Sequence, residues 1–217
     1  MMVAALAGAG AVLGWVTARL LAGFGYRLDE DDPRGVPGAP WWPVIALGLA
    51  WGVLAWRVGA YGRWSALPAT LLFAWLAVPL TWVDLDVHRL PDGLVLPGYP
   101  ALAVLLLLAT LGAQGGHWRG AVAGGLGLGM LFVILAVLPG GGMGAGDVKL
   151  AGLAGLLLGW FGGAALLTGV TATFLIGGLL GGVILLRGGS RRTRFAFGPA
   201  LCLGTLVGVA FGAALVG

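Results

Sequence analysis

Charged side chains are rare in this chain of 217 residues. Asp and Glu together number eight, Lys and Arg number twelve, and the four types make up 9% of the sequence, against roughly 25% in a typical globular domain. Hydrophobic residues make up 59%. So little charge and so much apolar surface exclude the soluble globular class, and we expect an integral membrane protein.

Cysteine is also nearly absent, since Cys202 is the only one. One thiol cannot form a disulfide within the chain or supply the paired cysteines of a zinc site. Because Cys202 lies in an apolar run, we expect a small core residue there. The two histidines, His88 and His117, fall on opposite faces of the membrane in the predicted topology, so they cannot share a metal ion. The sequence therefore predicts no metal site.

The distribution of basic residues excludes two further interpretations. The net charge is +4, but Lys and Arg are scattered over loops and form no face with aromatic side chains, so no nucleic-acid partner is expected. The first 24 residues lack a charged n-region, and their apolar stretch is longer than that of a signal peptide. We therefore expect a retained first membrane span.

Glycine, by contrast, is abundant, with 43 residues. No Gly-x-y period exists, which excludes a collagen-like chain. Pairs separated by three residues occur in apolar segments, at Gly125 and Gly129, Gly155 and Gly159, and Gly178 and Gly182. Because such pairs let helix backbones approach closely in lipid, we expect them at helix–helix contacts.

Apolar runs long enough to cross a bilayer cover most of the chain. A spanning helix needs about 20 residues, and the runs that meet this length are 3–24, 42–58, 66–84, 93–113 and 119–138. Residues 148–186 would make a helix about 58 Å long, nearly twice the bilayer core, so they must cross twice, with a reversal at Phe161-Gly162-Gly163. Residues 195–216 form the last run. The predicted fold is all-α, a polytopic membrane bundle of about eight transmembrane helices in a single domain, 1–217, with a short hydrophilic loop at 25–41.

Lys and Arg also predict the orientation of this bundle in the lipid bilayer. Cytoplasmic loops carry an excess of positive residues. An outward N-terminus places nine of them in or beside the odd-numbered loops and three in the even-numbered loops. The nine are Arg19, Arg27, Arg34, Arg89, Lys149, Arg187, Arg191, Arg192 and Arg194, and the three are Arg57, Arg63 and Arg119. This count predicts that both termini face outward.

Carboxylates are confined to three places in the sequence. Asp29 to Asp32 share the first loop, Asp84, Asp86 and Asp92 share the third, and Asp147 lies in the fifth. Placing a carboxylate in hydrocarbon costs about 2.5 to 3.5 kcal/mol on insertion scales, so such residues are functional candidates. The predicted topology puts all three places on the cytoplasmic face. For the first loop, a solvated surface and an attraction for a basic peptide both fit.

Each acidic residue of the third loop also has a structural interpretation. Asp84 ends the third helix and lies deepest toward the apolar side, which makes it the first candidate for chemistry. Asp86 is expected to be solvated or paired with Arg89. Asp92 follows Pro91 and is expected to begin the fourth helix, where an acidic residue suits the helix dipole.

Asp147 follows Gly142-Met143-Gly144-Ala145-Gly146, where glycine permits a close backbone approach. Taken alone, it is best interpreted as the N-cap of the sixth helix. A second aspartate loop on the same membrane face favours a catalytic role for Asp147 over a role as a helix cap. Two carboxyl groups a few ångströms apart cannot both ionise readily, so one keeps a proton while the other acts as a base toward water.

Three segments together resemble the signatures of the type IV prepilin peptidase family: residues 83–92, the run Gly144-Ala145-Gly146-Asp147-Val148-Lys149, and Phe197-Gly198-Pro199. In that family the first aspartate of the first segment and the Asp of the Gly-x-Gly-Asp motif form a catalytic dyad, which the resemblance places at Asp84 and Asp147. It implies a membrane aspartic endopeptidase that removes the basic leader from type IV prepilins or pseudopilins at the cytoplasmic face of the inner membrane. It implies no cofactor for proteolysis and covers about residues 66–216 well.

Several neighbours of the two aspartates are further candidates for binding substrate or shaping the site: Gly144, Gly146, Lys149, Asp86 and Pro91. Lys149 either lowers the pKa of a carboxyl group or extends its amine to the lipid headgroups at the membrane surface.

The chain departs from the family pattern before its second helix. Many members carry there a domain with two Cys-x-x-Cys pairs that bind zinc, and they methylate the new N-terminus with S-adenosylmethionine. Here a short loop, 25–41, contains no cysteine, which excludes zinc at that place. Methylation, S-adenosylmethionine binding and the oligomeric state stay open.

Three other classes remain as alternatives. An ion- or proton-coupled transporter also uses membrane carboxylates, although those usually lie near the midplane. A presenilin-type intramembrane protease shares the Gly-x-Gly-Asp motif, but its partner aspartate usually follows a tyrosine, whereas Val83 precedes Asp84. In a scaffold without chemistry, both aspartates would only cap helices.

Overall fold

Eight α-helices form the described part of the chain. A computed structural model describes residues 1–31, 33, 35, 41–112, 118–138, 143–186 and 196–212. The helices are α1 Met2–Leu21, α2 Trp42–Ala60, α3 Leu67–Val87, α4 Asp92–Gly112, α5 Trp118–Val137, α6 Ala145–Phe161, α7 Gly163–Leu186 and α8 Gly198–Phe211, with a 3₁₀ turn, η1 Trp64–Ala66, before α3. No strand occurs in these ranges. The prediction of an all-α bundle of about eight helices is confirmed.

Six of these helices are long and apolar enough to cross a membrane: α1, α2, α3 with η1, α4, α5 and α7. The helices α6 and α8 are shorter, at 17 and 14 residues. The chain is therefore a multi-pass membrane protein whose two shortest helices pack inside the bundle.

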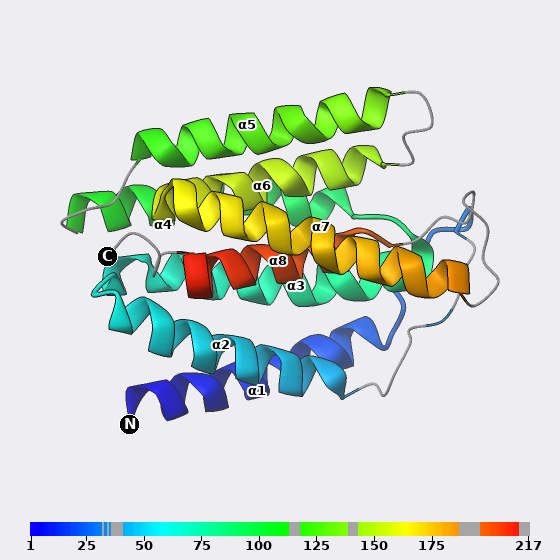
Figure 1. Ribbon diagram of the computed structural model, residues 1–217. Helices are drawn as coiled ribbons and strands as arrows, with labels where there is room; N and C mark the ends of the chain where they lie inside the picture. The colour runs from blue at the N-terminus through cyan, green and yellow to red at the C-terminus, as the bar shows by residue number, and fades with distance from the viewer. Residues whose placement is uncertain are drawn as a thin grey trace.

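The helices run back and forth along one direction, so the start of α1 and the end of α8 lie at one end of the bundle (Figure 1). The opposite end, where α3 ends and α6 and α8 begin, is called the site end below. The pair α1 and α2 forms one flank, α5 forms the other, and α3 and α8 lie between them (Figure 1). Alternating spans therefore bring the third and fifth loops to the same end, as the sequence predicted.

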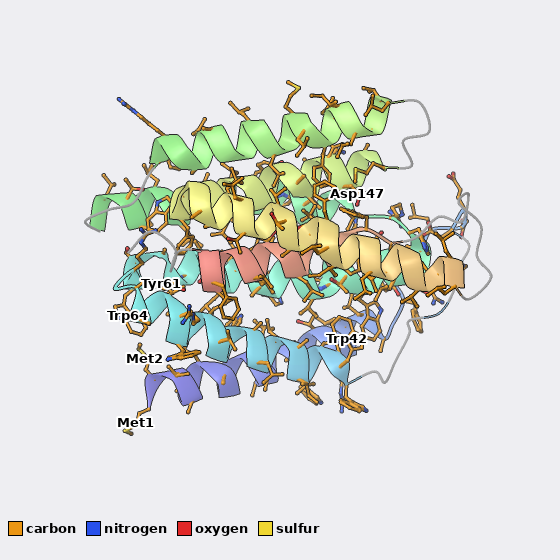
Figure 2. All side chains as sticks on the ribbon, viewed as in Figure 1. Met1, Met2, Trp42, Tyr61, Trp64 and Asp147 are labelled. Carbon is orange, nitrogen blue, oxygen red and sulfur yellow. The ribbon has the colours of Figure 1, made fainter. Side chains whose placement is uncertain are left out.

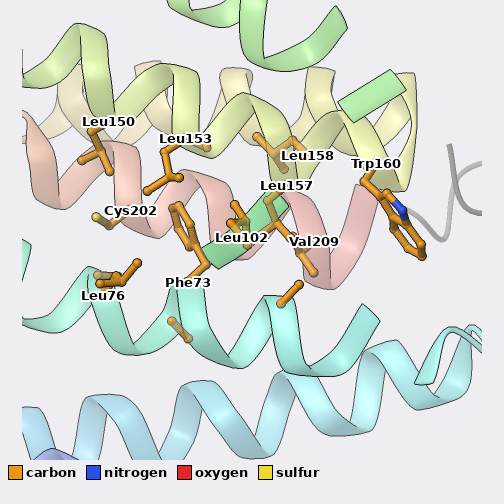
Figure 3. Close-up of a cluster of buried hydrophobic side chains, with 14 of the residues drawn as sticks. Phe73, Leu76, Leu102, Leu150, Leu153, Leu157, Leu158, Trp160, Cys202 and Val209 are labelled. Carbon is orange, nitrogen blue, oxygen red and sulfur yellow. The ribbon is translucent and has the colours of Figure 1, made fainter. Parts of the chain in front are cut away.

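The helix α6 lies inside the bundle with α3 and α8, and 11 of its 17 residues are buried. Its leucines face α3 and α8 in the close-up of the core (Figure 3). Leu153 and Leu157 of α6 are fully buried, as are Leu102 of α4 and Val209 of α8. The buried part of α6, residues 150–161, packs against other helices and so holds the direction in which its first turn, with Asp147, extends.

Small residues allow α5 and α6 to pack backbone against backbone. A side chain on Gly155 would meet the carbonyl of Gly124, and one on Gly159 would meet Gly120. Gly125 faces Leu156 and Gly152 in the same way, which confirms the close approach expected at these two glycine pairs.

The third glycine pair behaves differently from the prediction. Gly178 and Gly182 of α7 have open space within 4 Å of where a side chain would be, as far as the described residues go. The expected helix contact at this pair is therefore wrong. Gly178 and Gly182 lie outside the fully buried positions of α7, which are Ala165, Gly169, Thr173 and Gly177.

The reversal between α6 and α7 lies where the sequence predicted it. α6 ends at Phe161, and Gly162 adopts a positive φ of 111°, which side chains rarely allow. The guanidinium of Arg63 donates to the Phe161 carbonyl over 2.9 Å. Arg57 caps α8 in the same way by donating to the Ala210 carbonyl over 2.7 Å. Arg57 and Arg63, at the end opposite the site, thus satisfy carbonyls that the helix itself leaves free.

Two predicted helix boundaries are corrected at the site end. α3 runs to Val87 rather than ending at Asp84, because the chain turns only at His88, which has a left-handed φ of 50°. α6 begins at Ala145, so Asp147 is its third residue rather than its N-cap. Asp84 and Asp147 therefore both lie within helical turns, and the helix geometry fixes the direction in which each side chain points.

Candidate active site

Asp84 lies in the last turns of α3 and is 5% exposed. Its Oδ2 accepts a hydrogen bond of 2.8 Å from the backbone N–H of Gly198, the first residue of α8. N–H groups of a first helical turn have no partner inside the helix, and the dipole there favours negative charge. The N-terminus of α8 therefore provides a binding place for the Asp84 carboxylate.

Asp147 is held by the start of its own helix. Its Oδ2 accepts a hydrogen bond of 3.1 Å from the backbone N–H of Gly144, the residue at the N-cap position of α6. A side chain at the third helical position that reaches back to the N-cap N–H is one half of a capping box. Asp147 is thus fixed against the N-terminus of α6, as Asp84 is against the N-terminus of α8.

The two carboxyl groups lie within electrostatic range of each other, and both lie within range of the thiol of Cys202. Figure 2 shows Asp147 at the same end of the bundle as Trp42, opposite the end that carries Tyr61 and Trp64. The structure thus brings together, at one end of three helices, the two aspartates that the sequence placed on one face.

Leu90 packs between the two halves of the site. A side chain on Gly146 would meet Cβ of Leu90 at 2.8 Å, and one on Gly198 would meet Cδ2 of Leu90 at 3.2 Å and Oδ2 of Asp84 at 2.7 Å. Glycine at these two positions lets the loop before α4 and the start of α8 close onto the site. Gly144 contributes its N–H instead, since the nearest atom to a side chain there would be Oδ2 of Asp147, 3.6 Å away.

Asp86 faces away from Asp84, because residues two apart on a helix point in different directions. Its side chain is fully buried and binds the first loop rather than solvent. Arg27 donates to it from Nε over 2.7 Å and from Nη2 over 2.9 Å, and Tyr26 donates its hydroxyl over 2.6 Å. The backbone N–H of Gly35 donates over 3.0 Å. Burial, followed by the bond to Asp86, raises the pKa of Tyr26 to about 12, so the phenol stays a neutral donor.

The prediction that Asp86 is solvated or paired with Arg89 is therefore wrong. Arg89 pairs with Asp31 instead, at 2.9 Å, and also donates to the carbonyl of Tyr26 over 2.9 Å. The physical reason is the turn at His88, which separates Arg89 from the face of α3 that carries Asp86. The bond from Arg89 and the backbone N–H of Leu28 hold the pKa of Asp31 below its ordinary range.

The rest of the acidic run in the first loop is only partly described. Asp29 and Glu30 are exposed, in agreement with a solvated surface. Asp32 lies outside the described residues, as does His117.

Lys149 joins two helices at the site end. Its Nζ lies 2.8 Å from both oxygens of Asp92, the first residue of α4, and both side chains are substantially exposed. Asp92 begins α4 as predicted. The carbonyl of Pro91 accepts from the N–H groups of Leu94 and Val95, so Pro91 occupies the N-cap position just before this helix.

Cys202 is buried and free, as expected for a core residue. No group of three His, Cys, Asp or Glu side chains that could hold a metal ion occurs among the described residues. The arrangement therefore consists of carboxyl groups, backbone donors and apolar packing.

Two parts of this site do not follow from the sequence pattern. Nothing in the Phe197-Gly198-Pro199 motif signals that the Gly198 N–H binds Asp84, 114 residues away. Tyr26 and Arg27 lie in the short loop 25–41, where the sequence predicts no contact with the helices. Asp86 in an apolar helix could have pointed to Arg27, because a buried carboxylate is rarely left without a basic partner.

Two carboxyl groups, each held by a backbone N–H at one end of an apolar helical bundle, define a multi-pass membrane protein with an aspartate-pair site. The chain belongs to the type IV leader peptidase family, whose model matches residues 70–186, more than half of the chain. This stretch contains both Asp84 and Asp147.

Curated relatives agree with this assignment. The chain is 36% identical over 173 residues to a protein of Aeromonas hydrophila named "Prepilin leader peptidase/N-methyltransferase", covering 79% of this chain and 58% of the relative. Proteins of the same name in Neisseria gonorrhoeae and Bacillus subtilis are 37% and 27% identical, covering 74% and 67% of this chain and 54% and 56% of the relatives. The chain thus spans little more than half the length of these relatives. No solved structure matches it. Neither the family nor these relatives support a transporter.

Proposed function

We propose that the protein is a membrane aspartic endopeptidase that removes the basic leader peptide from type IV prepilins or pseudopilins, with Asp84 and Asp147 as its catalytic residues. The observation that carries this proposal is geometric: Asp84 at the end of α3 and Asp147 at the start of α6 lie at the same end of the bundle. Each carboxyl group is bound by a backbone N–H at the start of a helix. Membership of the leader peptidase family supports the reaction and the substrate.

The geometry suits a general acid–base mechanism. The Gly198 N–H holds Oδ2 of Asp84 and the Gly144 N–H holds Oδ2 of Asp147, so each carboxyl group keeps Oδ1 for a water molecule between them. One aspartate, ionised, takes a proton from this water as it attacks the scissile carbonyl carbon. The other, protonated, donates to the carbonyl oxygen, and the amine then leaves with a proton from the pair.

We propose that the site end faces the cytoplasm, in the inner membrane, with both termini outside. Arg27, Arg89 and Lys149 lie in the loops or helix starts of this end, and the charged segment with Arg191 and Arg192 also follows a helix that ends there. This agrees with the excess of positive residues in cytoplasmic loops. A basic leader would approach from the same side.

Proteolysis by this pair uses no cofactor. The methyl transfer in the relatives' names would use S-adenosylmethionine, whose polar ribose and amino-acid groups need hydrogen-bonding partners. The apolar groove between α2, α3 and α8 has almost no polar side chain in its lining, so it does not fit this cofactor, and we assign no step to it.

The test uses purified protein in liposomes with a synthetic prepilin precursor and S-adenosylmethionine, followed by mass spectrometry of the product. We expect loss of the leader with the wild-type protein and no cleavage with Asp84→Asn or Asp147→Asn. An added methyl mass on the product would extend the activity to methyl transfer.

Asp92→Asn is the matched control, because Asp92 lies at the same end but is exposed and bound to Lys149. It should keep substantial activity. Turnover at the wild-type rate by either Asp84→Asn or Asp147→Asn would refute the catalytic pair.

A further inference from the structure

An apolar groove of about 480 Å³ lies between α2, α3 and α8. Its lining runs along α2 from Trp42 to Leu54 and along α8 from Cys202 to Phe211. At 1.5 Å per residue these stretches are about 18 and 14 Å long, the length of roughly three turns of helix. The groove is therefore long enough to hold about three turns of a helix along its axis, which is much longer than a single side chain.

One end of this groove adjoins the two aspartates. Thr81, which lines it, precedes Asp84 by three residues on α3, and Cys202 follows Gly198 by four residues on α8. Cys202 also lies within electrostatic range of both Asp84 and Asp147. The groove thus ends about one helical turn from Asp84 along α3.

The other end of the groove is closed by hydrogen bonds. Arg57 and Tyr61 of α2 both donate to the carbonyl of Ala210 on α8, over 2.7 and 2.6 Å. Tyr61 lies at the end of the bundle opposite Asp147 (Figure 2). The groove consequently begins at the site and ends near the far end of the bundle.

The lining restricts the conformation of a peptide that enters. It consists almost entirely of apolar side chains, many of them small, such as Ala46, Ala50 and Ala77. An extended peptide would leave its backbone N–H and C=O groups without partners in such a place, whereas a helix satisfies them internally. Small residues also let a helix approach closely. The chemistry of the groove thus matches an apolar α-helix.

We propose that this groove binds the apolar helix of the substrate that follows the scissile bond, and so aligns that bond with Asp84 and Asp147. The inference rests on the proposed peptidase function and adds the place where the membrane-embedded part of the precursor lies. The scissile bond then sits where the helix emerges beside Thr81 and Cys202.

The first test fills the groove. Ala50→Phe adds a ring to its α2 wall, and Ala123→Phe makes the same change on the outer face of α5. Both proteins are reconstituted in liposomes with a precursor that carries its full apolar helix. We expect Ala50→Phe to lower kcat/KM by about 10-fold or more, mainly through KM, and Ala123→Phe to stay within about twofold of the wild type. Thermal unfolding in detergent verifies that both variants fold.

The second test needs no bulky side chain. Cys202→Ala removes the single native thiol, and Asp147→Asn stops cleavage. Into this background we place Leu206→Cys, which lies in the groove, or Ala123→Cys as the control. After addition of an oxidant such as copper–phenanthroline, a precursor with one cysteine two turns into its apolar helix should form a disulfide with Leu206→Cys and not with Ala123→Cys.

The proposal is overturned if folded Ala50→Phe cleaves the precursor with wild-type kcat/KM, or if both cysteine variants cross-link equally. A phospholipid that binds the wild type and is lost in Ala50→Phe, with cleavage unchanged, would assign the groove to an acyl chain and also overturn it. Absence of cleavage by the wild type would instead overturn the peptidase function, while the cross-links still report on the groove.

Discussion

The backbone N–H of Gly198 donates a 2.8 Å hydrogen bond to the carboxylate of Asp84 and so ties the start of α8 to the end of α3. A backbone donor at a helix N-terminus is fixed by the helix itself, so it holds the carboxyl group in one orientation without a second side chain.

Gly198→Ala should disturb this relationship. The new Cβ would lie 2.7 Å from Oδ2 of Asp84 and 3.2 Å from Leu90, so the start of α8 or the carboxyl group must move. Because displacements of about 1 Å can cost about 100-fold in rate, we expect a 10- to 100-fold loss of cleavage in protein that still folds. Gly178→Ala, which meets no described atom within 4 Å, is the control. Equal rates for the two variants would contradict the role given to Gly198.

The ion pair of Arg27 and Asp86 should stabilise the first loop. Asp86 is fully buried and Arg27 is 28% exposed, so removing either partner leaves the other without its bonds. We expect Asp86→Asn and Arg27→Gln each to lower the free energy of unfolding by about 1–3 kcal/mol. Because Asp86 faces away from Asp84 and binds the first loop, Asp86→Asn protein that stays folded should keep substantial activity.

A double-mutant cycle on this pair, followed by thermal unfolding in detergent, measures their coupling. We expect a coupling energy of about 1–2 kcal/mol. Strictly additive effects of the two substitutions would show that the pair contributes nothing as a pair.

Lys149 and Asp92 should behave differently, because their ion pair is exposed. Exposed pairs contribute about 0.2–1 kcal/mol. The cycle of Lys149→Gln and Asp92→Asn should therefore give a coupling within that range, and it should shrink in high salt. A coupling energy as large as that of the Arg27–Asp86 pair would contradict the expectation for an exposed ion pair and would show that Lys149 stabilises the protein through additional interactions.

Acid should release the first loop through Asp31. Arg89 and the Leu28 N–H hold the pKa of Asp31 below its ordinary range, so the group is more acidic when the loop is docked. Its stabilisation is present above the ordinary pKa of about 3.9 and is lost as the pH falls through the lower pKa of the docked state. Hydrogen exchange of residues 24–31 should thus be more protected at pH 6 than at pH 3 after correction for intrinsic rates. In Asp31→Asn this difference should diminish, and an unchanged difference would assign the pH effect to another group.

The sequence predicted the bundle and the meeting of the two aspartates for a simple reason. Helices that cross in alternation return odd-numbered loops to one end, so Asp84 and Asp147 had to face the same side. The reversal at Gly162 followed from length alone, since residues 148–186 are too long for one crossing.

The partners of those aspartates were not predictable in the same way. Pairing Asp86 with Arg89 follows from their proximity in sequence, but the left-handed turn at His88 sends Arg89 toward Asp31. The contact of Gly198 with Asp84 depends on how α8 is placed against α3, which no local pattern encodes. Local spacing predicts helices, whereas long-range packing decides which polar groups meet.

The short lengths of α6 and α8 have a consequence for hydrolysis, which consumes water. Their 17 and 14 described residues extend about 26 and 21 Å, less than a bilayer core of about 30 Å. Longer neighbours such as α7, with 24 residues, surround them, so the starts of the two short helices need not reach the level of the lipid headgroups. A recess at that end would let water descend to the carboxyl groups from one side, without any passage through which ions could cross the membrane.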